Sequence, residues 1–298
     1  MRAGRASRTA EHNALFRALE AARRVDRRAV HDPLARSFLR WPLAPVARLG
    51  ALPVARELIP PIIDRRWPGV RTAVVARTRL IDEILADVVT EETEQFVVLG
   101  AGYDSRAWRL PALAHLTVFE VDHPDTQRAK MRALPRVMPN VRFVPTDFSE
   151  EGLAAAMHAA DYREAAPTVM LWEGVTNYLT EEAVDATLRW CTRAAGGSTL
   201  VFTYVHRDVL DEPGRFVGGE RLFATLAKVG ERFTFGLDPG DLSTFLAGRG
   251  LALVSDEGAN EFRHRCYGAA AERMQGHEFY RVATARVAAT AAVAATAD

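Results

Sequence analysis

The stretch that decides the fold class is residues 96–123, FVVLGAGYDSRAWRLPALAHLTVFEVDH. One apolar run ends in Gly100-Ala101-Gly102, and a second apolar run ends in the acid Asp122. This pattern predicts a buried strand, a glycine turn that opens a helix, and a second strand whose terminal carboxylate can hold the hydroxyls of a ribose. The segment therefore indicates half of a site for an adenosine-containing cofactor.

The alternation of strands and helices continues along the chain. Short runs rich in β-branched and aromatic residues are separated by segments of helical length, which predicts parallel strands joined by crossover helices. The expected strands are residues 96–99, 117–121, 141–144, 168–171, 199–204, 251–254 and 280–287. The fold class is therefore α/β, with a doubly wound sheet.

Residues 1–70 predict helices and turns rather than strands. Residues 9–28 carry apolar side chains at helical spacing, and seven prolines interrupt residues 29–70. A second amphipathic helix is expected over residues 73–89. We therefore expect a helical lid segment at 1–70, followed by one domain at 71–298. Glycine and proline interrupt the alternation of strands and helices at about 207–240, which predicts an insertion over one end of the sheet.

Composition limits the classes of partner. The formal net charge is zero, which gives no electrostatic reason to expect nucleic acid or membrane as a partner. Residues 1–48 nevertheless hold 11 arginines against 4 acids, an excess that could draw an anionic acceptor. The two cysteines, Cys191 and Cys266, lack metal-ligand spacing, so we expect no metal site and a cytoplasmic location. The oligomeric state is left open.

Acids at the ends of successive strands indicate which cofactor binds. Asp122, Asp147 and Glu173 each follow a predicted strand, and the carboxyl ends of parallel strands line the ligand crevice. So many acids would repel a pyrophosphate but attract a sulfonium and an amino group. Ser105 also stands where the dinucleotide fingerprint has its third glycine. The residues thus favour S-adenosyl-L-methionine, with S-adenosyl-L-homocysteine as the product.

Several motifs, taken in order, carry a family resemblance. VVLGAGYDSRAWRL, FEVDHP, PTDF and LWEGVTNYL resemble successive motifs of the leucine carboxyl methyltransferase family, in particular the bacterial branch with tetracenomycin-type polyketide O-methyltransferases. TAEHNALFRALEAAR, DPLARSFL and ARTRLID are also similar to that branch. The resemblance implies a class I methyltransferase fold, in which a seven-stranded sheet has its last strand antiparallel.

The resemblance also implies roles for individual residues. By position, Arg77 would hold the cofactor carboxylate and Glu173 would line the methionine pocket. The turn at Gly100, Ala101 and Gly102 would lie under the methionine moiety. Asp122 would bind ribose, and Asp147 with Phe148 would frame adenine. Phe148 departs from the leucine usual in the family, although either side chain can pack on a purine. Each residue also has a structural alternative, namely a strand-end cap for Asp122, a helix cap for Asp147, a tight turn for Glu173 and a solvated helix face for Arg77.

The resemblance implies methyl transfer to an oxygen of a small molecule, anionic or aromatic, in secondary metabolism. A carboxylate acceptor is already ionised and needs no base, whereas a hydroxyl acceptor would need a base or a positioning group. Tyr178, Tyr204 and His206 are the candidates for that role. One alternative is a non-catalytic scaffold or regulator that binds S-adenosyl-L-methionine. A weaker alternative is a nicotinamide-dependent oxidoreductase.

Overall fold

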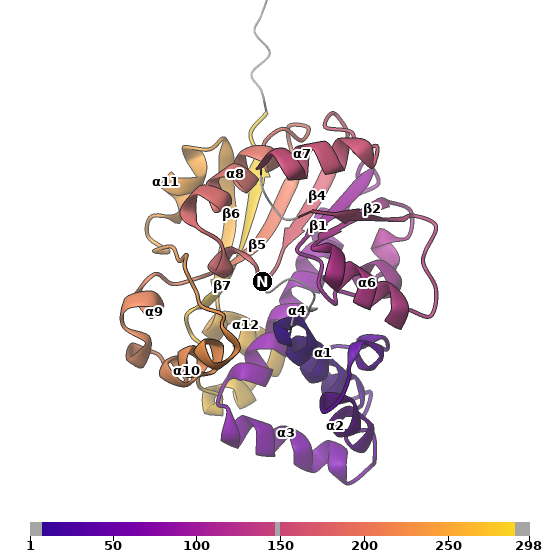
Figure 1. The fold of residues 1–298 in the computed structure, drawn as a ribbon. Coiled ribbons are helices and arrows are strands. Elements are labelled where there is room, and N and C mark those ends of the chain that lie inside the picture. Colours follow the sequence, from indigo (N-terminus) through magenta and orange to yellow (C-terminus); the bar gives the residue numbers. More distant parts are fainter. Residues whose placement is uncertain (1–7, 147–149, 290–298) are drawn as a thin grey trace, which may run out of the picture.

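The computed structural model describes residues 8–146 and 150–289. It contains a seven-stranded sheet with the strand order β3-β2-β1-β4-β5-β7-β6 (Figure 1). β1 to β5 run parallel, and β7 lies antiparallel between β5 and β6. The strands are β1 (Gln95–Leu99), β2 (Thr117–Asp122), β3 (Val141–Pro145), β4 (Thr168–Trp172), β5 (Thr199–Val205), β6 (Leu251–Gly258) and β7 (Tyr280–Val287). The predicted doubly wound sheet with an antiparallel last strand is confirmed.

The largest difference between expected and observed strands is at β6. The sequence predicts four residues there, but β6 runs for eight, to Gly258. Its polar second half, Ser255 to Glu257, pairs with β7 after a bulge between Leu253 and Ser255. β6 is an edge strand, so polar side chains can face solvent while its backbone stays paired on one side.

Helices cover both faces of the sheet (Figure 1). One face packs against α7 (Glu150–Ala159), α8 (Glu181–Cys191) and α11 (Leu242–Ala247), and its core includes Trp172, Trp190 and Phe202. The other face packs against α4 (Val70–Val88), the single turn α5 (Arg106–Arg109) and α12 (Ala259–Tyr267). β2 is followed by α6 (Pro124–Ala133). Short 3-10 helices lie at η2 (Pro111–Leu113) and η5 (Gly268–Arg273).

The N-terminal segment is helical and shares a core with the glycine turn. It contains α1 (Arg8–Ala21), η1 (Ala35–Phe38), α2 (Leu43–Leu49) and α3 (Ala55–Arg66). α1 ends at Ala21 rather than near residue 28, since the RRVDRR run at 23–28 offers almost no apolar surface to bury. Apolar side chains of this segment pack on Val74 of α4 and on Tyr103, which follows the glycine turn.

The expected insertion is also present. It carries α9 (Asp208–Asp211), η4 (Pro213–Arg215) and α10 (Gly219–Val229), and it lies beside η3 (Thr176–Tyr178). Its apolar side chains form a separate cluster around Val205, at the carboxyl end of β5. Insertion and N-terminal segment therefore both lie near the end of the sheet where the predicted cofactor residues are found.

Candidate functional site

The glycine turn follows β1 directly and is fastened to the end of β2. Gly100 and Ala101 donate backbone hydrogen bonds to the carbonyl of Val121 at 2.8 and 3.0 Å. Gly100 and Gly102 have φ angles of +70° and +45°, which other residues rarely adopt. A side chain at Gly100 would also collide with Val175. Both local backbone strain and close packing therefore require glycine at position 100.

Asp122 ends β2 and faces this turn. One carboxylate oxygen accepts a hydrogen bond from the amide of Gly102, and the other accepts one from the amide of His123 at 2.6 Å. Burial raises the pKa of Asp122, and the two amide donors oppose that shift. A carboxylate has about four acceptor sites, so two backbone bonds leave it able to accept further hydroxyl groups.

Arg77 and Glu173 form a buried ion pair although they lie 96 residues apart. Arg77, in the middle of α4, donates from Nε to Glu173 Oε1 at 2.8 Å. Burial alone would raise the pKa of Glu173, but the guanidinium groups of Arg106 and Arg77 outweigh it and lower that pKa. Arg77 also lies over the ring of Tyr280, 5.5 Å from its centroid. The alternative of a solvated helix face for Arg77 is therefore wrong, since the side chain is only 5% exposed.

Arg106 links three carboxylates, a role that was not predicted from the sequence. It donates from Nε to Asp82 at 2.7 Å and from Nη1 both to Glu173 at 2.8 Å and to Asp104. Burial would raise the pKa of Asp104, but Arg106 outweighs it and the pKa falls to about 2. Arg109 completes the network with two bonds to Asp82, at 2.6 and 2.8 Å. The sequence did contain a signal for this network, because two charged residues, Asp104 and Arg106, stand within a buried turn.

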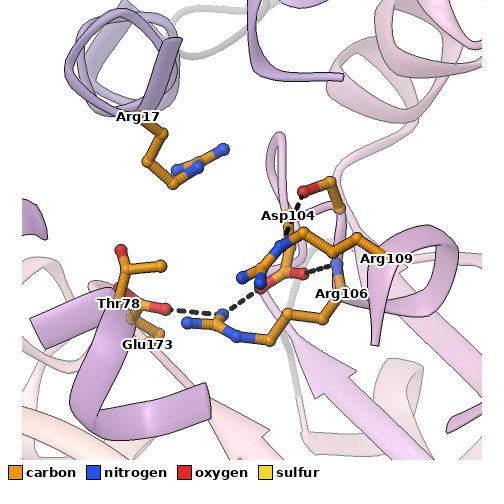
Figure 2. A pocket seen from close by; sticks show the side chains of 7 residues that line it. Arg17, Thr78, Asp104, Arg106, Arg109 and Glu173 are labelled. Carbon is orange, nitrogen blue, oxygen red and sulfur yellow. Dashed lines mark hydrogen bonds and ion pairs between the residues drawn. The ribbon is translucent and has the colours of Figure 1, made fainter. Parts of the chain in front are cut away.

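A small polar hollow lies at the centre of this network. Figure 2 shows the side chains that line it, with Arg17 reaching in from α1 toward Asp104, Arg106 and Glu173. The hollow has room for about one water molecule. Arg17 is held by Asp32 at 2.9 Å and by the carbonyl of Tyr103 at 2.6 Å. α1 therefore covers the glycine turn and is fixed to it by a charged side chain.

The structure does not bring the three catalytic candidates together. The phenol of Tyr204 donates to Asp256 Oδ2 on β6 at 2.8 Å, and Asp256 also pairs with Arg281 at 2.9 Å. Burial and the neighbouring Asp256 raise the pKa of Tyr204. His206 is partly exposed, packs on the ring of Phe216, and accepts a hydrogen bond from the Asp208 amide at 3.2 Å. Tyr204 thus already has a structural partner away from the glycine turn.

Tyr178 belongs to an aromatic cluster that the insertion helps to build. Its ring meets Phe233 edge-on at 5.2 Å, and Phe233 in turn meets Phe223 at 5.5 Å and Tyr280 at 6.4 Å. Tyr280, the first residue of β7, connects this cluster to Arg77. From the sequence, Tyr280 was expected only as the first residue of a strand. The aromatic cluster, which we define as Tyr178, Phe216, Phe223, Phe233, Phe279 and Tyr280, lies beside the Arg77–Glu173 pair.

Two further predicted residues cannot be placed. Asp147 and Phe148, expected to frame adenine, lie outside the described residues. Within residues 8–146 and 150–289, no group of three or more potential metal ligands is found. The candidate site therefore consists of the glycine turn, Asp122, the Arg77–Glu173–Arg106 network and the aromatic cluster.

Comparison with known proteins shows which family the chain belongs to. The model of the leucine carboxyl methyltransferase family matches residues 10–192, more than half of the chain. A protein of Frankia alni described as an S-adenosyl-L-methionine-dependent methyltransferase is 34% identical over 212 residues, which are 68% of this chain and 70% of that protein. A protein of Streptomyces coelicolor with the same description is 33% identical over 224 residues, 71% of this chain and 72% of that protein.

Solved structures agree at the level of the fold. A methyltransferase structure from Thermobifida fusca aligns with a TM-score of 0.59 at 15% identity, covering 92% of this chain and 94% of that one. A structure of a DUF574 family protein from Streptomyces avermitilis aligns with a TM-score of 0.55 at 17% identity, covering 78% and 90%. The chain therefore belongs to the leucine carboxyl methyltransferase family and is an S-adenosyl-L-methionine-dependent methyltransferase with the class I fold.

Proposed function

We propose that this methyltransferase transfers the methyl group to an oxygen of a small aromatic molecule, either a carboxylate or a hydroxyl, in secondary metabolism. The observation that carries the proposal is the aromatic cluster, which lies beside the predicted cofactor residues and takes three of its six rings from the insertion. Aromatic side chains bind flat apolar molecules well, because they offer large rigid surfaces.

The residues at the glycine turn fit the cofactor. Asp122 retains acceptor capacity beyond its two backbone bonds, which suits the two hydroxyls of a ribose. Among the residues that the structure describes, Arg77 donates a hydrogen bond only from Nε, so its two Nη groups can take a carboxylate. Glu173 is ionised and would face the amino group of the methionine moiety. When bound, the cofactor supplies an electrophilic methyl on a sulfonium.

The chain itself positions the acceptor and excludes water. Burial raises the pKa of Tyr178, and it raises the pKa of Tyr280 to about 12. Both phenols therefore stay protonated at neutral pH and can donate hydrogen bonds to an acceptor oxygen, but they cannot remove its proton. This favours an acceptor that is already an anion, such as a carboxylate or an acidic phenol.

We also propose that residues 1–70 act as a lid. α1 lies against the glycine turn, where Gly102 comes close to Ala10 and Arg17 bonds to Tyr103. Thr9 of α1 donates to Glu231, next to α10, at 2.7 Å. The N-terminal segment thus touches both halves of the proposed chamber, and its displacement would open both of them together. Alignment of acceptor and cofactor in such a closed site can supply several kcal/mol of barrier lowering.

The test is methyl transfer to a matched panel of acceptors that differ only in the reacting group: an aromatic carboxylic acid, the corresponding phenol and the corresponding amine. We expect labelled methyl to be recovered on oxygen. A methyl ester releases methanol in mild base and a methyl ether does not, so hydrolysis distinguishes the two products. Methylation of the amine or of a ring carbon alone would overturn the oxygen assignment.

Two variants connect the proposal to the site. Phe233→Ala removes a central ring of the aromatic cluster, and we expect a raised KM for the acceptor with unchanged cofactor affinity. Val254→Ser, at an exposed position on β6, is the matched control and should change neither. Binding of S-adenosyl-L-methionine without transfer to any acceptor, unaffected by Phe233→Ala, would favour the scaffold alternative.

A further inference from the structure

Exposed apolar side chains gather in the segment that carries α2 and α3, both on these helices and in the residues that flank them. Seven of the twelve exposed large apolar side chains of the described residues lie within residues 41–67, and they are 42–83% exposed. We call these seven the basic apolar face: Trp41, Leu49, Leu52, Val54, Leu58, Ile62 and Trp67. Monomeric proteins rarely expose so many large apolar groups together without an interaction that covers them.

The outer side of α3 is itself an apolar stripe. Val54, Leu58 and Ile62 follow at four-residue spacing and so lie on one side of the helix, while Pro60 and Ile63 are buried on the other. α3 lies at the edge of the molecule farthest from the sheet (Figure 1). α2 precedes it across residues 50–54. The stripe therefore contributes little to the protein's own core and remains open to a partner.

The charges around this face are strongly positive. Residues 36–67 hold six arginines and two acids, a net charge of +4. Both acids are engaged already: Glu57 pairs with Arg27 and Arg56 at 3.9 and 3.7 Å, and Asp64 is held by Arg71 at 2.6 Å. The exposed arginines of this segment, of which Arg40 also pairs with Glu11 at 3.4 Å, thus stand next to exposed leucine, isoleucine and tryptophan in the sequence. They are Arg36, Arg40, Arg48, Arg65 and Arg66.

This combination selects one kind of partner. A second copy of the chain, bound about a twofold axis, would place the arginines of one copy against the same arginines of the other. Their charge repulsion would oppose the apolar contact. An anionic lipid bilayer instead has an apolar interior into which the stripe can insert, and its negative headgroups attract the arginines. The first and last of the seven residues in the sequence are the tryptophans Trp41 and Trp67, and tryptophan is enriched at the boundary between lipid and water.

We propose that the basic apolar face docks on the surface of an anionic phospholipid bilayer. No helix within the described ranges, 8–146 and 150–289, is long and apolar enough to cross a membrane, so the face would lie in the interface plane. The zero net charge of the whole chain gave no reason to expect a membrane partner, because it averages a positive segment with a negative remainder. This inference does not depend on the identity of the methyl acceptor.

The test is co-sedimentation of the full chain with vesicles of phosphatidylcholine, with and without phosphatidylglycerol. We expect binding only to the anionic vesicles, weakening as salt is added. The double variant Leu58→Ser/Ile62→Ser should weaken binding about tenfold or more, since it removes two inserting side chains. Arg65→Gln/Arg66→Gln should weaken it about 30-fold at low salt. Met131→Ser/Val254→Ser, at exposed positions on α6 and β6, should bind like the unaltered chain.

Three outcomes would overturn the proposal. The first is absence of binding to anionic vesicles by the unaltered chain. The second is equal binding by both double variants of the face, provided that their melting temperatures match that of the unaltered chain. The third is a dimer in sedimentation that dissociates in Leu58→Ser/Ile62→Ser while lipid binding is absent, which would assign the face to a second copy.

Discussion

Arg106→Ala is the substitution whose effect follows most directly from the structure. The Arg106 side chain is 3% exposed and holds Asp82 of α4, Asp104 of the glycine turn and Glu173 after β4. The substitution removes one of the guanidinium groups that neutralise these three largely buried carboxylates. Asp82 keeps Arg109 and Glu173 keeps Arg77, but Asp104 loses its main partner.

The expected cost is about 3–5 kcal/mol of stability, as for other buried ion pairs from which one partner is removed. For a chain of this size, each kcal/mol shifts Tm by about 2–4 °C, so the fall in Tm should be on the order of 10 °C. Cofactor affinity should fall as well, because the same side chain connects the glycine turn to Glu173. Arg106→Lys keeps the charge but cannot reach three carboxylates at once, and we expect an intermediate loss.

The pH dependence of stability provides the most specific test of this prediction. The pKa of Asp104 is lowered to about 2 against an ordinary value of 3.8, and the pKa of Glu173 is lowered too. Carboxylates with lowered pKa values add stability above their unfolded pKa, and this stability is lost as pH falls through the folded pKa. Without Arg106, burial would raise the pKa of Asp104. Asp104 would then become neutral on mild acidification, and the penalty would shrink.

The assay is thermal unfolding of both proteins from pH 7 to pH 4. We expect the gap in Tm to be widest at pH 7 and to narrow toward pH 4. Arg142→Ala is the control, because its removal leaves no buried carboxylate: Arg142 pairs with the exposed Asp161, and such surface pairs contribute about 1 kcal/mol or less. Its other contacts, with the Ala160 carbonyl and the Phe119 ring, involve no titratable group. A gap in Tm that stays constant with pH, or one no larger than that of Arg142→Ala, would refute the reasoning.

Three further predictions concern the cofactor and the chemistry. Asp122→Ala should weaken S-adenosyl-L-methionine binding about tenfold or more, through loss of charged hydrogen bonds to ribose; unchanged affinity by calorimetry in the folded variant would contradict this. Gly100→Val should abolish cofactor binding while the sheet stays folded, because the new side chain would collide with Val175 and position 100 has a positive φ angle. Circular dichroism checks the fold of the variant, and calorimetry checks its cofactor binding. Tyr204→Phe and His206→Ala should each lower kcat far less than the ~10²–10⁴-fold typical of a lost general base, and a larger loss at unchanged KM would point to a hydroxyl acceptor that needs a base.

The sequence predicted the parts of the fold that depend on local pattern. All seven strands are found where apolar and β-branched runs were expected, and the glycine turn lies between β1 and β2. The turn could be predicted because glycine spacing and the acid at position 122 are local signals. β6 was expected too short, since an edge strand can carry polar residues that look like a loop in the sequence.

The parts that escaped prediction depend on contacts between distant residues. Arg106 joins carboxylates at positions 82 and 173, a relation that no spacing in the sequence expresses. Tyr204 was expected to serve the acceptor and ends the predicted strand at residues 199–204, yet the phenol of Tyr204 donates to Asp256 on β6. Tyr280 became part of the site only because β7 inserts between β5 and β6 and so brings its first residue close to Arg77.

The most direct test of the account is a crystal structure of the protein with S-adenosyl-L-homocysteine. We expect both ribose hydroxyls within hydrogen-bonding distance of the Asp122 carboxylate, the amino-acid carboxylate on Arg77, and the sulfur facing the aromatic cluster around Tyr178 and Tyr280. The account would be contradicted by a ligand whose ribose lies away from Asp122, or whose sulfur faces away from the aromatic cluster.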